Sequence, residues 1–227
     1  MKYFFLYISL IFCGFSTYAQ INELGIFVGG TNYIGDVGPT TYIAPNEPAF
    51  GIIYKWNRSP RHAYRFSYTQ GNLTSKDSDS DVPSRFLRGN SFKNSVKEFS
   101  AGLEFNFMDF DLHDSDSKVS PYVYSGISYF IYDEIFILDN TSKFDYQSST
   151  FAIPMVVGIK GRFLENFIIG AEIGFRYTFT DNLDGSNPKN DNFETLRFGN
   201  LNSNDWYVFT GLTLTYTFGE NPCFCAE

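Results

Sequence analysis

The sequence predicts an all-β fold, an eight-stranded antiparallel up-and-down transmembrane β-barrel, and three observations support this prediction. Apolar side chains alternate with small or polar ones along most of the 227 residues, which is the period of a strand. Aromatic residues make up 19% of the chain, and charged residues also make up only 19%, below the roughly 25% of ordinary soluble domains. The connections between the alternating segments are short and long in turn, as in outer-membrane barrels.

The first nineteen residues have the pattern of a secretory signal peptide. Lys2 precedes an apolar run over residues 3–15, and Thr17 and Ala19 have the spacing that a signal peptidase recognises before Gln20. The apolar run is shorter than the roughly 20 residues of a membrane-spanning helix. We therefore expect a signal peptide over residues 1–19, a barrel over residues 20–218 and a periplasmic tail over residues 219–227.

The first four strands are expected at about residues 22–35, 49–57, 62–73 and 95–107. In each of them, apolar side chains occupy every second position and are expected to face outward. These residues are Leu24, Ile26 and Val28, then Phe50, Ile52, Tyr54 and Trp56, then Tyr64, Phe66 and Tyr68, and finally Phe99, Ala101, Leu103, Phe105 and Phe107. Many positions between them carry glycine, hydroxyl or charged side chains, so each strand has one apolar and one mixed face.

The last four strands are expected at about residues 119–132, 149–161, 167–180 and 206–218. The first two are less regular, and Pro154 is expected to weaken a central strand because it lacks a backbone N–H. The other two alternate cleanly, with apolar faces made by Phe167, Ile169, Ala171, Ile173, Phe175, Tyr177 and Phe179, and by Trp206, Val208, Thr210, Leu212, Leu214, Tyr216 and Phe218. Trp206 at one end and Tyr216 at the other are expected to mark two aromatic girdles.

The connections distinguish a membrane barrel from a secreted sandwich or lipocalin-like protein, an alternative that the strands alone leave open. The short and moderate ones span residues 58–61, 108–118 and 162–166, and the long ones span residues 36–48, 74–94, 133–148 and 181–204. Outer-membrane barrels alternate short periplasmic turns with long extracellular loops in this way. We therefore expect contact with outer-membrane lipid and both termini in the periplasm.

The inward faces of the predicted strands carry an equal number of acids and bases. The acids are Glu23, Glu98, Glu104 and Glu172, and the bases are Lys55, Arg65, Lys160 and Arg176. An eight-stranded barrel is only wide enough for its side chains to fill, and buried charges persist when they are paired. We interpret these residues as a charge network that plugs the lumen, in preference to an ion path.

Other functions find little support in the sequence. The net charge of −8 argues against a nucleic-acid partner, and no nucleophile-elbow, metal-ligand or phosphate-loop pattern indicates an enzyme or a cofactor. Both histidines, His62 and His113, fall in connections assigned to the periplasmic side. Residues 76–81 resemble the start of a calcium loop, but Val82 replaces the required glycine and Arg88 the bidentate glutamate. A solvated loop tip is expected there.

The tail carries two cysteines, Cys223 and Cys225, separated by one residue. In the oxidising periplasm they are able to form a disulfide. A bridge across a single intervening residue lies near the limit of disulfide geometry and would exchange readily. An internal bridge and a covalent link to a partner both remain open at this point.

Three stretches give the chain a specific resemblance. They are residues 23–30 with Tyr33, Gly35 and Asp36, then residues 170–181, and finally residues 218–225 with the two cysteines. Together they resemble the PorG-like outer-membrane barrel family of Bacteroidota, from whose pattern residues 182–185 depart. The resemblance implies a component of the type IX secretion machinery, associated with a periplasmic ring that includes a lipoprotein.

The leading interpretation is therefore a barrel that is not an enzyme and that anchors or organises a periplasmic secretion complex. One alternative is a stand-alone surface barrel whose long loops bind ligands or other cells. A third possibility is an enzyme that modifies outer-leaflet lipid.

Overall fold

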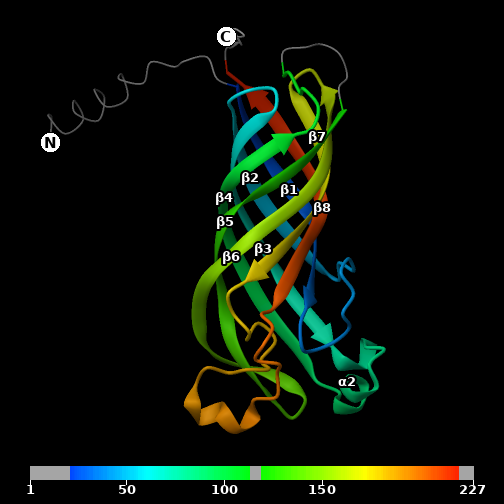
Figure 1. The fold of residues 1–227 in the computed structure, drawn as a ribbon, viewed down its shortest axis with the longest axis vertical. Coiled ribbons are helices and arrows are strands. Elements are labelled where there is room, and N and C mark those ends of the chain that lie inside the picture. The colour runs from blue at the N-terminus through cyan, green and yellow to red at the C-terminus, as the bar shows by residue number, and fades with distance from the viewer. Residues whose placement is uncertain (1–20, 113–118, 220–227) are drawn as a thin grey trace, which may run out of the picture.

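The computed structural model describes residues 21–112 and 119–219, which form one closed β-barrel (Figure 1). The strands are β1 (Ile21–Ile34), β2 (Glu47–Asn57), β3 (His62–Lys76), β4 (Ser91–Asn106), β5 (Val119–Leu138), β6 (Thr141–Leu164), β7 (Phe167–Thr178) and β8 (Trp206–Phe218). Each pairs antiparallel with its sequence neighbours, and β8 pairs with β1 to close the ring. The predicted eight-stranded antiparallel up-and-down barrel is confirmed. The predicted signal peptide and residues 220–227 of the predicted tail lie outside the described residues.

The two rims of the barrel differ. One rim, called here the turn end, carries residues 58–61 and 165–166, and the pair Asn22–Phe218 places both ends of the described chain there. The opposite rim, called the loop end, carries residues 35–46, 77–90 and 179–205 together with the turn between β5 and β6. It lies at the bottom of Figure 1. The predicted alternation of short and long connections therefore holds for these segments.

The expected long loop over residues 133–148 is wrong, because β5 and β6 continue as a hairpin beyond the barrel wall. Their turn is Asp139–Asn140, and both residues have positive φ, 53° and 62°, as a two-residue type I′ turn requires. A register shift between Glu134 and Ile135 breaks the period-two pattern on which the sequence interpretation relied. β4 likewise begins at Ser91, inside the segment expected to be a loop.

Pro154 disturbs its strand locally, as its chemistry predicts. The β5–β6 pairs run as far as Ser125 with Met155 and resume at Ser128 with Ala152, so Pro154 lies in a gap of the ladder. On the other side of β6 it is still paired with Arg176 of β7. The missing N–H therefore interrupts the hydrogen-bonded pairing of β6 with β5, while the pairing of β6 with β7 continues.

The outer wall is a continuous belt of exposed apolar side chains, with examples on every strand. They include Leu24 and Ile26, Phe50 and Ile52, Phe66, Phe99 and Leu103, Ile127, Ile153, Met155 and Val157, Ile169, and Leu212 and Leu214. A soluble protein rarely exposes an apolar patch of this extent. This is the lipid-facing pattern of a membrane barrel.

Aromatic pairs border the belt at both ends. Toward the turn end, the ring centroids of Trp56 and Tyr64 are 5.5 Å apart and those of Phe167 and Tyr216 are 5.3 Å apart. Toward the loop end, the corresponding pairs are Tyr68 with Phe99 at 4.8 Å, Tyr129 with Phe151 at 5.4 Å, and Tyr177 with Trp206 at 5.1 Å. Trp206 and Tyr216 thus lie at opposite borders, as expected.

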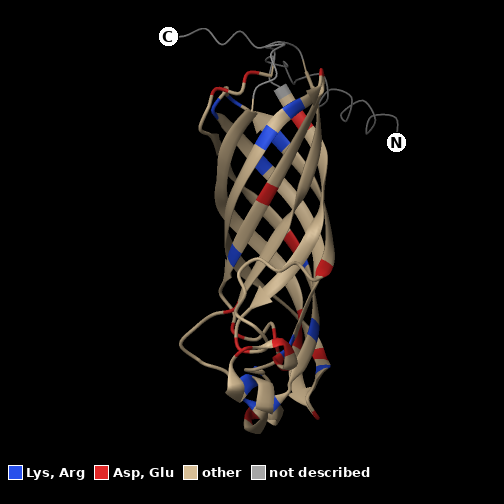
Figure 2. Ribbon diagram, turned by 90° about the vertical axis from the view of Figure 1, so that its right-hand side faces the viewer, with Lys and Arg blue, Asp and Glu red and all other residues tan. Residues whose placement is uncertain are grey.

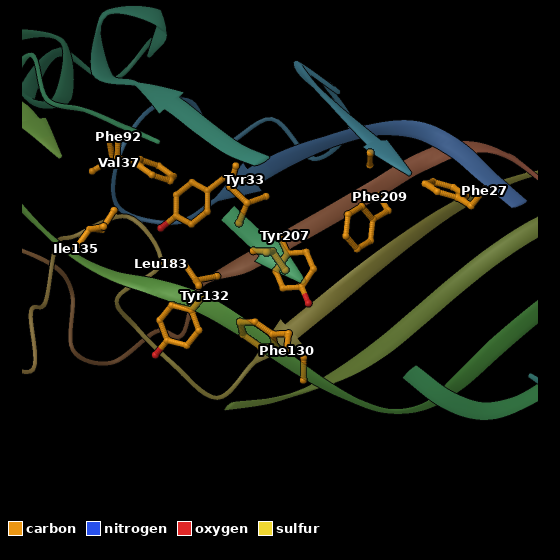
Figure 3. Close-up of a cluster of buried hydrophobic side chains, with 14 of the residues drawn as sticks. Phe27, Tyr33, Val37, Phe92, Phe130, Tyr132, Ile135, Leu183, Tyr207 and Phe209 are labelled. Atoms are coloured by element: carbon orange, nitrogen blue, oxygen red, sulfur yellow. The ribbon is translucent and has the colours of Figure 1, made fainter. Parts of the chain in front are cut away.

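The long loops contain the short helical segments η1 (Asp77–Asp79), α2 (Pro83–Arg88) and η2 (Asp191–Leu196). Within residues 21–112 and 119–219, no helix has the length and apolarity needed to cross a membrane. The largest buried apolar cluster begins among the strands and continues into the loops (Figure 3), where Tyr33, Val37, Phe92, Ile135 and Leu183 meet. The loop end is therefore a packed cap.

Candidate functional site in the lumen and the loop cap

All eight charged residues predicted to face inward lie inside the barrel. The most exposed of them, Glu172, has 6% of its surface accessible, and Glu23, Glu98 and Glu104 have none. They reach the lumen from six strands because each occupies a mixed-face position of a period-two segment. Figure 2 shows acidic and basic positions spaced along the barrel strands and others gathered in the cap.

The centre of the network is the carboxylate of Glu104. Lys55 Nζ lies 2.8 Å from Glu104 Oε2, and Lys160 Nζ lies 2.6 Å from Glu104 Oε1. Arg65 Nη1 is 3.6 Å from the same carboxylate. Three cations from three strands therefore converge on one anion, and their residual positive charge is met by Glu172 and Glu23.

Arg65 and Glu172 form a two-pronged ion pair across the lumen. The two guanidinium nitrogens of Arg65 each lie 2.7 Å from a different oxygen of Glu172. Tyr122 also donates its hydroxyl hydrogen to Glu172, at 2.6 Å. The ring of Tyr124 covers the Arg65 guanidinium, with its centroid 4.9 Å away. Parallel hydrogen bonds of this kind fix geometry as well as adding energy.

A second ion pair lies between Arg176 of β7 and Glu98 of β4. Arg176 donates to both carboxylate oxygens, with Nε at 3.1 Å from Oε2 and Nη2 at 3.1 Å from Oε1. Tyr207 donates to Glu98 at 2.6 Å, and the Phe209 ring centroid is 4.8 Å from the Arg176 guanidinium. Tyr207 and Phe209 thus contact this ion pair as Tyr122 and Tyr124 contact the first.

Glu23 completes the set at the turn end. Its carboxylate accepts hydrogen bonds from Asn57 at 2.9 Å and from Thr215 at 2.8 Å, and Lys55 Nζ is 4.0 Å away. The four acids and four bases are thus joined to one another or to neutral donors from several strands. Charges satisfied in this way bind the strands together, and they fill the interior that an open channel would need.

The loop cap has a second buried polar system, which the sequence did not reveal. Asp77, expected at a solvated loop tip, is fully buried, so that expectation is wrong. Its carboxylate accepts from Arg88 Nε at 2.7 Å, from the Gly38 N–H at 2.8 Å and from the Asn90 N–H at 3.0 Å. Arg88, which stands where a calcium loop has its glutamate, instead supplies the counter-charge. The only signal in the sequence for this buried ion pair was a basic residue, Arg88, eleven positions after the acidic Asp77.

Two buried aspartates tie loop 179–205 to β1 and the loop after it. Asp205 accepts hydrogen bonds from the Tyr33 hydroxyl and, at 2.8 Å, from the Leu183 N–H. Asp184 accepts from the Val37 N–H at 3.1 Å and from the Ser186 N–H at 2.9 Å. These bonds hold the loop inside the mouth of the barrel.

Three carboxyl groups of loop 179–205 have raised pKa values. Burial, reinforced by the charge of Asp184, raises the pKa of Asp205 well above its usual range, and burial also raises the pKa of Asp184. Burial together with Asp36 and Asp184 raises the pKa of Asp181 to about 6. Among the described residues, no three His, Cys, Asp or Glu side chains are arranged to hold a metal ion.

His62, another candidate from the sequence, lies at the turn end. His62 Nδ1 is 3.2 Å from Ser59 Oγ, but that hydroxyl already accepts from the N–H groups of Arg61 and His62. The contact is thus part of a tight turn. His113, Cys223 and Cys225 lie outside the described residues.

Arg176→Met is expected to destabilise the barrel by about 3–5 kcal/mol, because it leaves the Glu98 charge buried without its partner. In gel electrophoresis of samples heated to increasing temperatures, the variant should change from the folded to the unfolded band at a lower temperature than the wild type. The exposed cation Arg58 gives a matched control, and Arg58→Met should melt with the wild type. The double variant Arg176→Met, Glu98→Met should recover most of the loss. A single variant as heat-resistant as the wild type would contradict the pairing.

The cap is expected to loosen as pH rises. A carboxyl with a raised pKa holds its proton in the closed cap, so its contribution is complete below its ordinary pKa of about 4 and is lost as pH passes its closed-state pKa. For Asp181 that window ends at about pH 6. Hydrogen exchange at the Val37 and Leu183 amides, corrected for intrinsic rate, should therefore be slower at about pH 5 than at about pH 7.5.

Asp181→Asn should weaken that pH dependence, because it removes one titrating group. Asp191, whose side chain is 97% exposed, provides the control, and Asp191→Asn should leave the dependence intact. Protection that rises with pH in the wild type would contradict the sign of the effect.

Comparison with solved structures found similar chains at low sequence identity. The chain is similar to Ail, the attachment invasion locus protein of Yersinia pestis, with 13% identity over 88% of this chain and 99% of that one and a TM-score of 0.48. Neisserial surface protein A has 12% identity over 88% of this chain and 96% of that one, with a TM-score of 0.46. The N-terminal β-barrel domain of Pseudomonas aeruginosa OprF has 12% identity over 88% of this chain and 98% of that one, with a TM-score of 0.45. No curated protein sequence matches the chain.

A family model matches almost the entire length, from residue 2 to residue 227. The chain therefore belongs to the family described as Domain of unknown function (DUF6089).

Proposed function

We propose that this protein is an outer-membrane barrel that serves as a sealed scaffold. The observation that carries the proposal is the lumen, where four acids and four bases are paired and buried between aromatic side chains. A solute channel needs a wider, water-filled interior. The exposed apolar belt between two aromatic borders supports placement in a bilayer. Closure of the barrel also lets the strands hydrogen-bond their backbone groups to one another inside that bilayer.

The proposed orientation places the turn end in the periplasm and the loop end outside the cell. Short connections at one rim and long ones at the other support it. Because Asn22 and Phe218 pair at the turn end, the segments that precede and follow the barrel are on the periplasmic side in this orientation. The tail with Cys223 and Cys225 is then available to periplasmic proteins.

We further propose that the scaffold belongs to the type IX protein secretion machinery and organises its periplasmic ring, which includes a lipoprotein. The support is the resemblance in sequence to PorG-like barrels. Two stretches of that resemblance include residues with structural roles here. Glu172 and Arg176 belong to the lumen network, and Tyr33 binds Asp205 in the cap.

A surface barrel that binds ligands through its loops is the second candidate. The observation in its favour is the packed cap, which holds the loops in one arrangement and exposes Phe86 and Leu87 on α2, at 58% and 84% of their surfaces. In that case the loops, and not the tail, would carry the function.

Thiol labelling tests the orientation. Leu201, in loop 179–205, is 77% exposed, and Arg58 is exposed at the turn end. In a variant without Cys223 and Cys225, Leu201→Cys should react with an impermeant thiol reagent on intact cells, and Arg58→Cys should react only after the outer membrane is opened. The reverse pattern would invert the barrel, and equal labelling of both on intact cells would contradict membrane insertion.

Co-purification tests the secretory role. The detergent-solubilised protein should carry periplasmic ring components, including a lipoprotein, and a reductant-sensitive species should disappear in the variant Cys223→Ser, Cys225→Ser. Loss of export in a deletion strain should be restored by the wild type. Normal export without the protein would eliminate this role, whereas loop deletions that abolish ligand or cell binding would favour the second candidate.

A further inference from the structure

β6 extends beyond β7 at the loop end, and residues 147–151 have no strand paired on the β7 side. At the start of β6, Thr141 pairs with Ser91 of β4. The final β6–β7 pair joins Ala152 to Thr178, whereas β6 begins at Thr141. Figure 1 shows the lime ribbon of β6 continuing below the yellow arrowhead of β7. On its other side the same part of β6 is paired with β5. The barrel is closed, but the hairpin above it has a free edge.

One hydrogen bond establishes which main-chain groups face that edge. The Phe151 carbonyl accepts from the Phe179 N–H at 3.1 Å, so Phe151 points toward the β7 side. In an antiparallel strand the N–H and C=O of one residue point to the same side, and successive residues alternate. Ser149 and Gln147 therefore present their N–H and C=O groups to the free edge as well.

Among the described residues, no neighbouring backbone is hydrogen-bonded to these groups on the β7 side. After Phe179 the chain turns into the barrel mouth, where Thr180 and Leu183 are buried. Loop 179–205 returns to β6 through its side chains, with Asn190 Nδ2 donating to Asp145 Oδ2 at 3.0 Å. Among the described residues, the backbone of Gln147 and Ser149 takes no part in the hydrogen bonds made outside the strand ladders.

The free edge lies outside the apolar belt. Phe151 belongs to the aromatic border, where it packs against Tyr129, and the residues that follow it toward the hairpin tip are Thr150, Ser149, Ser148 and Gln147. Unpaired main-chain groups are not tolerated in hydrocarbon, so this position is the first at which an open edge is possible. Lipid tails offer no donors or acceptors to such an edge.

The chemistry of the edge selects its occupant. Alternating N–H and C=O groups at strand spacing match another polypeptide backbone in extended form. A second copy in the same membrane does not fit, because antiparallel pairing of equal edges places the two-fold axis perpendicular to the local sheet. That axis is radial to the barrel and lies in the membrane plane, so it would turn the second barrel upside down.

We propose that the edge formed by Gln147, Ser149 and the N–H of Phe151 binds an extended segment of another polypeptide, which joins the sheet as an added strand. From Gln147 to Phe151 the edge is roughly 13 Å long at about 3.3 Å per residue, enough for a segment of about five residues. β-branched and aromatic residues suit the added strand. The binding site goes beyond the proposed scaffold role and is independent of the periplasmic tail.

The test uses the full chain in detergent micelles and labelled nine-residue peptides in which threonine alternates with valine, tyrosine or phenylalanine. At least one peptide should bind, measured by fluorescence anisotropy, and binding should slow hydrogen exchange at the Gln147 and Ser149 amides. Gln147→Pro removes one edge N–H and should weaken binding about tenfold. Gln147→Ala loses the same side chain but keeps the N–H, so it should bind like the wild type.

A measurement on the peptide side covers the case in which Gln147→Pro does not fold. Methylation of the peptide nitrogens that face the edge should abolish binding to the wild type, and methylation of the alternate nitrogens should not. Absence of binding by every peptide would overturn the proposal. So would equal binding by Gln147→Pro and Gln147→Ala, or protection of the edge amides by concentration-dependent self-association alone.

Discussion

The pairing of buried charges in the lumen is the constraint on which the rest of the structure depends. Glu104 holds two lysines, Glu172 holds Arg65 and Glu98 holds Arg176, so strands far apart in sequence are cross-linked through the interior. An unpaired charge at any of these positions would be costly in so small a barrel. Because these charges lie inside the barrel, the outer face of the strands is largely apolar, which suits a bilayer.

Most of the barrel could be predicted from the sequence, because one physical rule governs it. Residues such as Glu172 and Arg176 alternate with Ile173 and Phe175, and that alternation identifies both the strand and its inward face. The sequence does not say which acid meets which base. That depends on the stagger of strands around the ring. Here Arg65 makes its two shortest contacts with Glu172 on the distant strand β7, and its contact with Glu104 on the neighbouring strand β4 is longer, at 3.6 Å.

The loop end was harder to predict because its structure arises from contacts between distant segments. The bulge beside Glu134 and Ile135 reverses the alternation, so a strand resembled a loop. Asp77 looked like a solvated acid, yet Arg88 and the Gly38 N–H bury it. Tyr33 and Asp205 meet only when β1 and β8 close the ring. Each feature depends on tertiary structure that no local pattern reports, and the same closure decides where β6 is left with an open edge.

Single-channel recording tests the sealed lumen most directly. The purified barrel, with intact loops and refolded into a planar bilayer, is expected to add no steady conductance over the bare membrane, because the lumen is filled by the network around Glu104 and Glu98. Truncation of the cap should not change that result, since the seal lies within the barrel. A stable, ion-selective conductance from the wild type would contradict the account and would identify the charged residues as an ion path.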